Sequence, residues 1–146
     1  MKSLADFRAI QSAIDPRSGR YDAKQLAQLL DWTSAEVAQY LERSPAMIAT
    51  SPTSPTLQDK LAILAALFRD LVAAFTVPDE KDIEPDVRAY MPFYDGKPMD
   101  AVAAARAWLR TPIRSLDNQS AKARILAGRI DWVQGLVESW QDGFNF

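Results

Sequence analysis

The chain has 146 residues, a hydrophobic content of 48%, a formal net charge of −2, and neither cysteine nor histidine. Without cysteine there are no disulfides or thiolate metal sites, and without histidine there is no histidine-ligated zinc and no histidine-dependent serine or cysteine triad. Carboxylate, Lys or Tyr chemistry is left open and would need a convergent site. Because the sequence indicates no such site, we expect a non-enzymatic protein that needs no cofactor and no metal.

Neither the start of the chain nor its most apolar stretch indicates secretion or a membrane span. Asp6 follows Met1 too closely to leave room for the apolar core of a signal peptide. The most apolar stretch, from Leu61 to Val77, is interrupted by Arg69-Asp70 and is shorter than the roughly 20 residues that span a bilayer. We expect a soluble, cytoplasmic protein without a membrane partner.

Helices only, and hence an all-α fold, are predicted because apolar residues recur at spacings of three and four while period-two alternation is almost absent. The first helix is expected from about Leu4 to Ile14, followed by a turn over residues 15–19. Asp22 is expected to cap a second helix and Thr33 a third. Glu36, three residues after Thr33, completes a capping box.

The fourth helix is predicted to be the longest, from about Pro55 to Phe75, after a loop over residues 44–55. A heptad-like seam is formed by Leu57, Leu61, Leu64, Phe68, Leu71 and Phe75. Ile63, Leu67 and Val72 lie off this seam, so the helix is expected to be buried on more than one side. The second face indicates either a core packed from two sides or a homodimer interface.

Residues 23–42 match a helix-turn-helix, with ten residues from Ala27 to Val37. Operator DNA is therefore one predicted partner. Its predicted contacts are Lys24, Ser34, Gln39 and Arg43. Because Glu36 and Glu42 on the same helix oppose phosphate binding, the match indicates either a weak DNA-binding element or a structural helical hairpin.

An acidic connector is predicted over residues 76–97, since residues 76–100 carry seven acidic and three basic side chains. The carboxylates of residues 80–86 lack the glycine turn and terminal glutamate of an EF-hand loop, so a solvated linker explains them better than a cation site. Three helices are expected to follow. They run from about Pro98 to Arg110, from the cap Ser120 to Gly128, and from the cap Asp131 to near Gly143.

Specific motifs mark this C-terminal part: Trp108-Leu109-x-x-Pro112, Leu116 before a turn, a Ser120-capped helix ending in Gly128, and then Asp131-Trp132-Val133. They resemble the toxin-binding domain of the Xre/MbcA/ParS antitoxin family, and the helix-turn-helix resembles that family's Xre-like domain. The resemblance implies an Xre-like helix-turn-helix domain over residues 1–75, a linker over 76–97 and a toxin-binding domain over 98–146. It also implies an antitoxin that sterically inhibits a RES-domain toxin, an enzyme that depletes NAD.

Three positions depart from the family pattern. Ile113 stands where the family commonly has Asn, Asp117-Asn118 replaces a Gly-Gly turn, and Ala121 replaces Pro. Asp and Asn are the residues other than Gly that best tolerate turn conformations, so the fold is expected to persist.

More apolar and aromatic side chains occur in the last third of the chain than a short domain is expected to bury, and exposed Trp and Arg residues often anchor interfaces. The predicted toxin-binding residues are Trp108, Leu109, Pro112, Leu116, Arg124, Gly128, Trp132, Val133, Trp140, Phe144 and Phe146. Trp132 and Trp140 are expected on one face of the last helix, whereas Trp108 and Leu109 are also explained as core. Two other functions stay open: a stand-alone helix-turn-helix transcriptional regulator and a dimerisation module.

Overall fold

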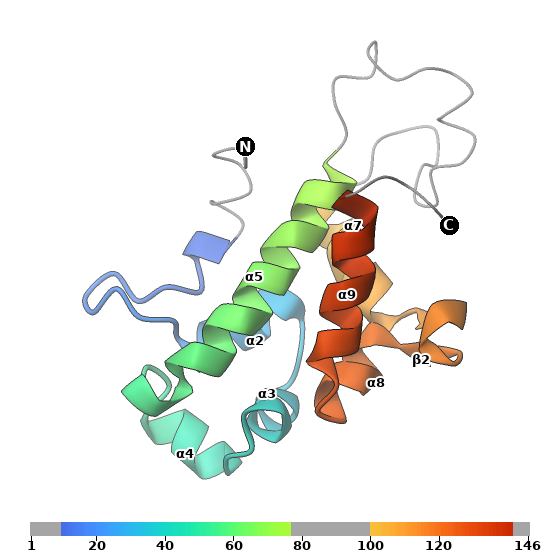
Figure 1. Ribbon diagram of the computed structural model, residues 1–146. Coiled ribbons are helices and arrows are strands. Elements are labelled where there is room, and N and C mark those ends of the chain that lie inside the picture. Colours follow the sequence, from blue (N-terminus) through green and yellow to red (C-terminus); the bar gives the residue numbers. More distant parts are fainter. Residues whose placement is uncertain (1–9, 77–99, 142–146) are drawn as a thin grey trace.

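The structure, a computed structural model, describes residues 10–76 and 100–141 (Figure 1). Its helices are α2 (Ala23–Leu30), α3 (Ser34–Leu41), α4 (Pro45–Thr50), α5 (Gln58–Phe75), α7 (Ala101–Arg110), α8 (Ala121–Leu126) and α9 (Ile130–Gln141). Short 3-10 helices cover Pro55–Leu57 and Arg114–Leu116, and two strands, β1 (Pro112–Ile113) and β2 (Gln119–Ser120), pair antiparallel. The described part is therefore mostly helical, which confirms the predicted all-α class.

The start of the described chain differs from the predicted first helix. Residues 10 and 11 are helical, but Ile14 pairs with Tyr21 in an isolated antiparallel bridge. The helix therefore ends before Ile14, and residues 1–9 of the prediction lie outside the described residues. The expected turn follows, with Gly19 at a φ of 71°, a conformation that glycine adopts without steric cost.

The helix-turn-helix over residues 23–42 is favoured by hydrogen bonds that cap its two helices with side chains close in sequence. The Asp22 carboxylate accepts hydrogen bonds from two backbone N–H groups in the first turn of α2. Thr33 and Glu36 form the predicted capping box, with contacts of 3.1 and 2.9 Å. Asp31 takes the left-handed conformation, with a φ of 60°, in the turn between the helices. The inward side chains are buried: Leu26, Ala27, Leu30, Val37 and Tyr40.

Helix α4 corrects the prediction of a loop over residues 44–55. The Ser44 hydroxyl caps this helix by accepting from the backbone N–H of Met47, and Pro45 occupies its first position. Proline is favoured there because the first N–H of a helix has no intrahelical acceptor. Ile48 then anchors the short helix in the core, where it is 1% exposed.

Helix α5 packs against α2 and also against α7 and α9 (Figure 1). The predicted burial on more than one side is confirmed. Its buried side chains are Leu61, Leu64, Ala65, Leu67, Phe68, Leu71 and Val72. Of the second face, Leu67 and Val72 are buried, whereas Ile63 stays 39% exposed, and homodimerisation stays a prediction.

A small hairpin of β1 and β2 joins α7 to α8, so the expectation of helices only is wrong here. Pro112 pairs with Ser120 and Ile113 with Gln119. The chain reverses at Asp117 and Asn118, whose φ angles of 57° and 62° lie in the left-handed region. These are the two positions at which the resembled family carries glycine, and Asp and Asn tolerate that region best after Gly.

The last two helices largely follow their predicted signals. The Ser120 hydroxyl caps α8 by accepting from the Ala123 N–H at 3.0 Å. Helix α8 ends with Ala127 as its C-cap, and Gly128 follows with a φ of 83°, as expected for a glycine just past a helix end. Asp131, predicted as the cap of the last helix, instead lies inside its first turn, because α9 begins at Ile130.

One hydrophobic cluster joins both parts of the chain. Leu30 and Phe68 belong to it together with Leu109 and Ile125. In the described residues, the ranges predicted as two domains therefore share a core. None of the described helices has the length and apolar character that crossing a membrane would need.

Candidate protein-binding surface

Four of the predicted toxin-binding side chains lie in the core. Trp108, Leu109, Leu116 and Val133 are at most 8% exposed. Their burial leaves little side-chain surface for a partner, and it agrees with the explanation of Trp108 and Leu109 as core residues.

Trp140, expected on the same face of the last helix as Trp132, packs against the hydrophobic cluster. It is partly buried, with its ring edge-on to Trp108 at 5.1 Å between centroids and to Phe75 at 6.3 Å. The prediction that Trp132 and Trp140 lie on one face of the last helix is therefore wrong. Side chains eight positions apart diverge by about 80° around a helix axis, enough to place one indole inside and the other outside.

Trp132 is the exposed member of the series, with 41% of its surface accessible. Two guanidinium groups lie on its ring: that of Arg124 at 4.8 Å and that of Arg129 at 4.4 Å from the centroid. Such cation–π contacts hold an indole in place even at a solvent-exposed site. Arg124 comes from α8 and Trp132 from the first turn of α9, so the α8–α9 turn builds this arrangement.

Each of these arginines is also held by an acidic neighbour. Both oxygens of the Asp131 carboxylate accept from Arg129, at 3.1 and 3.2 Å. Arg124 donates to Asp117 at 3.0 Å and to the Leu116 carbonyl. The hydrogen bonds from Arg129 hold the pKa of Asp131 below its usual value. Trp132 thus stands in a preformed, charge-balanced frame, which we call the Trp132 surface: Asp117, Arg124, Arg129, Asp131 and Trp132.

A groove of about 420 Å³ lies on another side of the α8–α9 turn. Its lining comes from α3, α5 and that turn, and comprises Gln39, Tyr40, Glu42, Lys60, Ile63, Leu126, Ala127, Gly128 and Ile130. Ile63 is 39% exposed and, with Trp132, is one of two exposed large hydrophobic residues in the described chain. In the sequence Ile63 is apolar and lies off the heptad seam, and neither property indicates that it is exposed.

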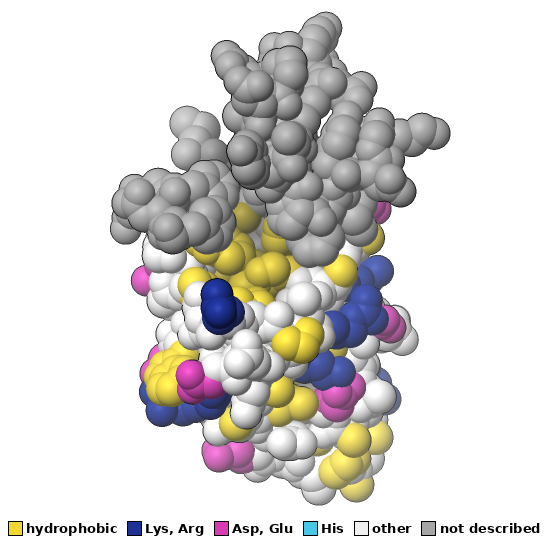
Figure 2. All heavy atoms as spheres, turned by 90° about the vertical axis from the view of Figure 1, so that its right-hand side faces the viewer, with side chains coloured by type: hydrophobic (Ala, Val, Ile, Leu, Met, Phe, Trp, Pro, Cys, Tyr) yellow, Lys and Arg dark blue, Asp and Glu magenta, His cyan; other side chains and the backbone are white. Residues whose placement is uncertain are grey.

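Seen from the side where α8, α9 and β2 lie in Figure 1, hydrophobic side chains form separate patches with acidic and basic side chains between them (Figure 2). On this face the exposed apolar surface is therefore divided among separate patches, and the large hydrophobic residues that the described chain exposes are Ile63 and Trp132. Of the remaining predicted residues, Pro112 and Gly128 are exposed. Phe144 and Phe146 lie outside the described residues.

The residues predicted to contact DNA do not form one free face. Lys24, Ser34 and Arg43 are exposed. The Gln39 side chain, however, donates to the Leu126 carbonyl at 3.2 Å, so it is turned toward the end of α8.

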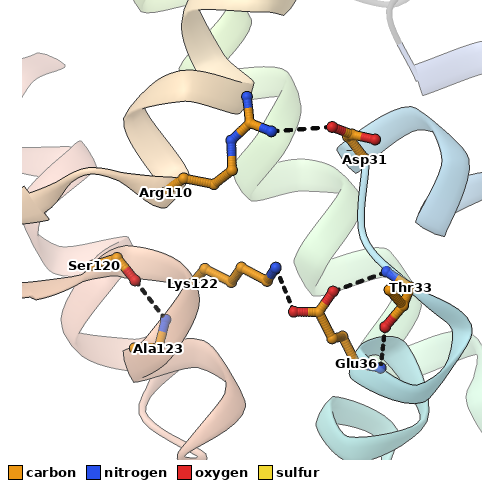
Figure 3. A network of polar contacts seen from close by, with 7 residues as sticks. All are labelled: Asp31, Thr33, Glu36, Arg110, Ser120, Lys122 and Ala123. Atoms are coloured by element: carbon orange, nitrogen blue, oxygen red, sulfur yellow. Dashed lines mark hydrogen bonds and ion pairs between the residues drawn. The ribbon is translucent and has the colours of Figure 1, made fainter.

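Ion pairs add to this contact between the two halves of the chain. Arg110 pairs with Asp31 at 3.0 Å, and Lys122 pairs with Glu36. Figure 3 shows both pairs crossing from α7 and α8 to the helix-turn-helix. Burial tends to raise the pKa of Glu36, but Lys122 and the Thr33 hydrogen bonds outweigh it and hold that pKa below the usual value.

Within residues 10–76 and 100–141, no three acidic side chains gather closely enough to hold a metal ion. The Trp132 surface offers an exposed indole and paired charges. Comparisons of the chain with models of protein families, with curated proteins and with solved structures find no match.

Proposed function

We propose that this chain is a non-enzymatic binding protein and that the Trp132 surface is where a partner protein docks. The observation that carries the proposal is Trp132, in the first turn of α9, which is 41% exposed and has the guanidinium groups of Arg124 and Arg129 on its ring. Trp and Arg are enriched among the residues that dominate binding energy in protein interfaces. An indole that is already held in place loses little conformational freedom on binding, which favours affinity.

The specific form we propose is an antitoxin acting in the cytoplasm. Its support is the resemblance, strongest over residues 101–137, to the toxin-binding domain of the Xre/MbcA/ParS family, which suggests a RES-domain, NAD-depleting toxin as the partner. The α8–α9 turn would then cover the toxin's cleft and exclude its substrate. Arg124 and Arg129, each paired with an acidic side chain, would mainly set the rate and register of association.

The test is co-expression with the RES-domain protein that an antitoxin gene is expected to have as its neighbour. Growth rescue and co-purification are measured for the wild-type chain and for Trp132→Ala. We expect Trp132→Ala to weaken binding by about 30-fold or more, as for a hot-spot residue, and to lose rescue. Glu138→Ala is the matched control, because Glu138 is exposed on the same helix.

Two outcomes would count against the proposal. If Trp132→Ala binds and rescues as well as the wild type, the assigned surface is wrong. If no RES-domain toxin is bound at all, the antitoxin form is wrong. Helicity of each variant is checked by circular dichroism, so that loss of binding is not confused with loss of fold.

A further inference from the structure

Helix α3 stands where a helix-turn-helix places the helix that reads DNA, yet little of it is free. Four of its eight side chains are buried: Val37, Ala38, Tyr40 and Leu41. Glu36 and Gln39 reach residues of the C-terminal helices. Of the eight, Ser34, Ala35 and Gln39 are exposed, and the Gln39 side chain is directed to α8 by its hydrogen bond. A recognition helix needs a continuous exposed face to reach base edges.

Contacts along the whole helix-turn-helix hold the C-terminal helices in place. Arg106 of α7 donates to the Leu29 carbonyl, at the end of α2, at 2.6 Å. Farther along, Arg110 pairs with Asp31 in the turn and Lys122 with Glu36 in α3 (Figure 3). At the far end Gln39 donates to the last carbonyl of α8. Lys122 also lies over the ring of the buried Trp32, at 5.8 Å.

The combined width of α3 and α8 conflicts with entry of α3 into the major groove of DNA. The major groove is about 12 Å wide and admits one helix. Helix α8 contacts α3 through Glu36 and Gln39, two side chains outside the buried set of α3. Two packed helices lie about 8–10 Å apart, each about 10 Å thick, so α3 with α8 on that side is too wide for the groove. Gln39, the side chain best suited to read a base edge, is on the side that α8 occupies.

We infer that α3 is the docking site for this chain's own α8, and that this contact masks the helix-turn-helix from duplex DNA. DNA binding through α3 then requires α8 to move away, so the two states exclude each other. The inference stands apart from the Trp132 surface and does not rest on the proposed partner.

The test uses Lys122→Glu in the full chain, which places a second carboxylate against Glu36. Binding of a fluorescent mixed-sequence DNA duplex is measured by anisotropy at low ionic strength, and opening of α3 by amide hydrogen exchange. A change from Lys to Glu by itself weakens binding to phosphates. Masking predicts the opposite sign: faster exchange in α3 and tighter DNA binding, by a factor of about five or more.

Arg114→Glu is the matched control, because it makes the same charge change on the same part of the chain at an exposed residue. It is expected to lower DNA affinity or leave it unchanged, with no effect on exchange in α3. Should Lys122→Glu lose its fold, Lys122→Met removes the ion pair without introducing a repulsive charge.

Three results would overturn the inference. One is unchanged exchange in α3 when the ion pair is removed. A second is faster exchange without any gain in DNA binding. The third is a wild-type chain that binds duplex as tightly as Lys122→Glu and loses that binding on Gln39→Ala.

Discussion

The indole of Trp140 meets that of Trp108 edge-on, with 5.1 Å between ring centroids and 81° between ring planes. Offset and edge-to-face geometries of this kind are favourable because the positive edge of one ring lies against the negative face of the other. Phe75, near the end of α5, lies on Trp140 from a third helix. This aromatic cluster therefore joins α5, α7 and α9.

Replacing Trp140 by Ala is expected to destabilise the chain. Truncating a fully buried Trp costs about 3–5 kcal/mol, and because Trp140 is only partly buried we expect about 2–3 kcal/mol. The measurement is the midpoint of urea unfolding followed by circular dichroism. Trp132→Ala is the control, expected to change the free energy of unfolding by less than about 1 kcal/mol, since its cation–π contacts are exposed. Equal losses for the two variants would contradict the assignment of one indole to the core and the other to the surface.

The capping box of α3 leads to a second prediction. Thr33→Ala removes the oxygen that accepts from the Glu36 N–H at 3.1 Å and is expected to cost about 1 kcal/mol. Thr33→Ser keeps the hydroxyl and is expected to retain most of that stability. Both are compared by urea unfolding, and a Thr33→Ala chain as stable as Thr33→Ser would show that the cap contributes nothing.

Features decided within three or four residues were predictable from the sequence. The caps at Asp22, Thr33 and Ser120 and the glycine after α8 depend on local hydrogen bonds and local backbone angles, and all four form. Helix α4 shows the limit of this reasoning. The pair Ser44-Pro45 is compatible with the start of a loop or of a helix. The helix is favoured because Ile48 is buried in the core, and the nearby sequence does not indicate that burial.

The candidate surface could be predicted only in part, because exposure depends on which distant element covers a residue. Trp132 and Trp140 have equivalent sequence signals, yet Phe75 and Trp108 cover only Trp140. The contact from Gln39 to Leu126 joins residues 87 positions apart. No spacing rule within one helix indicates that α8 will lie on α3.

Acidification is expected to destabilise the folded chain through carboxylates that it keeps ionised. Interactions in the fold lower the pKa of Glu36 from 4.5 and the pKa values of Asp15 and Asp131 from 3.8. A lowered folded-state pKa gives stability that is present above the unfolded value and is lost as pH falls through the folded value. The free energy of unfolding should therefore decline below about pH 4.5.

Glu36→Gln tests how much the Glu36 carboxylate contributes to the decline of the unfolding free energy on acidification. The amide oxygen still accepts from the Thr33 N–H, while the charge that pairs with Lys122 is lost. We expect this variant to be less stable than the wild type at neutral pH and to lose less stability on acidification. Glu138→Gln, at an exposed carboxylate on α9, should follow the wild-type curve. Parallel curves for Glu36→Gln and the wild type would contradict the assigned role of Glu36.

At alkaline pH, ionisation of Tyr40 is expected to lower the stability of the folded chain. Burial raises the pKa of its hydroxyl from 10.0 to about 12, and the hydroxyl donates to the Lys60 carbonyl at 2.7 Å, which only the neutral form can do. A raised folded-state pKa gives stability that is fully present below the unfolded value near 10 and is lost as pH rises toward 12.

Tyr40→Phe should be less stable by about 1 kcal/mol at neutral pH, the usual net value of a hydrogen bond. In the window between the two pKa values its unfolding free energy should fall less steeply than that of the wild type. The difference in tyrosinate absorbance between the two chains reports the ionisation of Tyr40 directly, and its appearance near the unfolded value in the folded protein would show that the hydroxyl is not held as described.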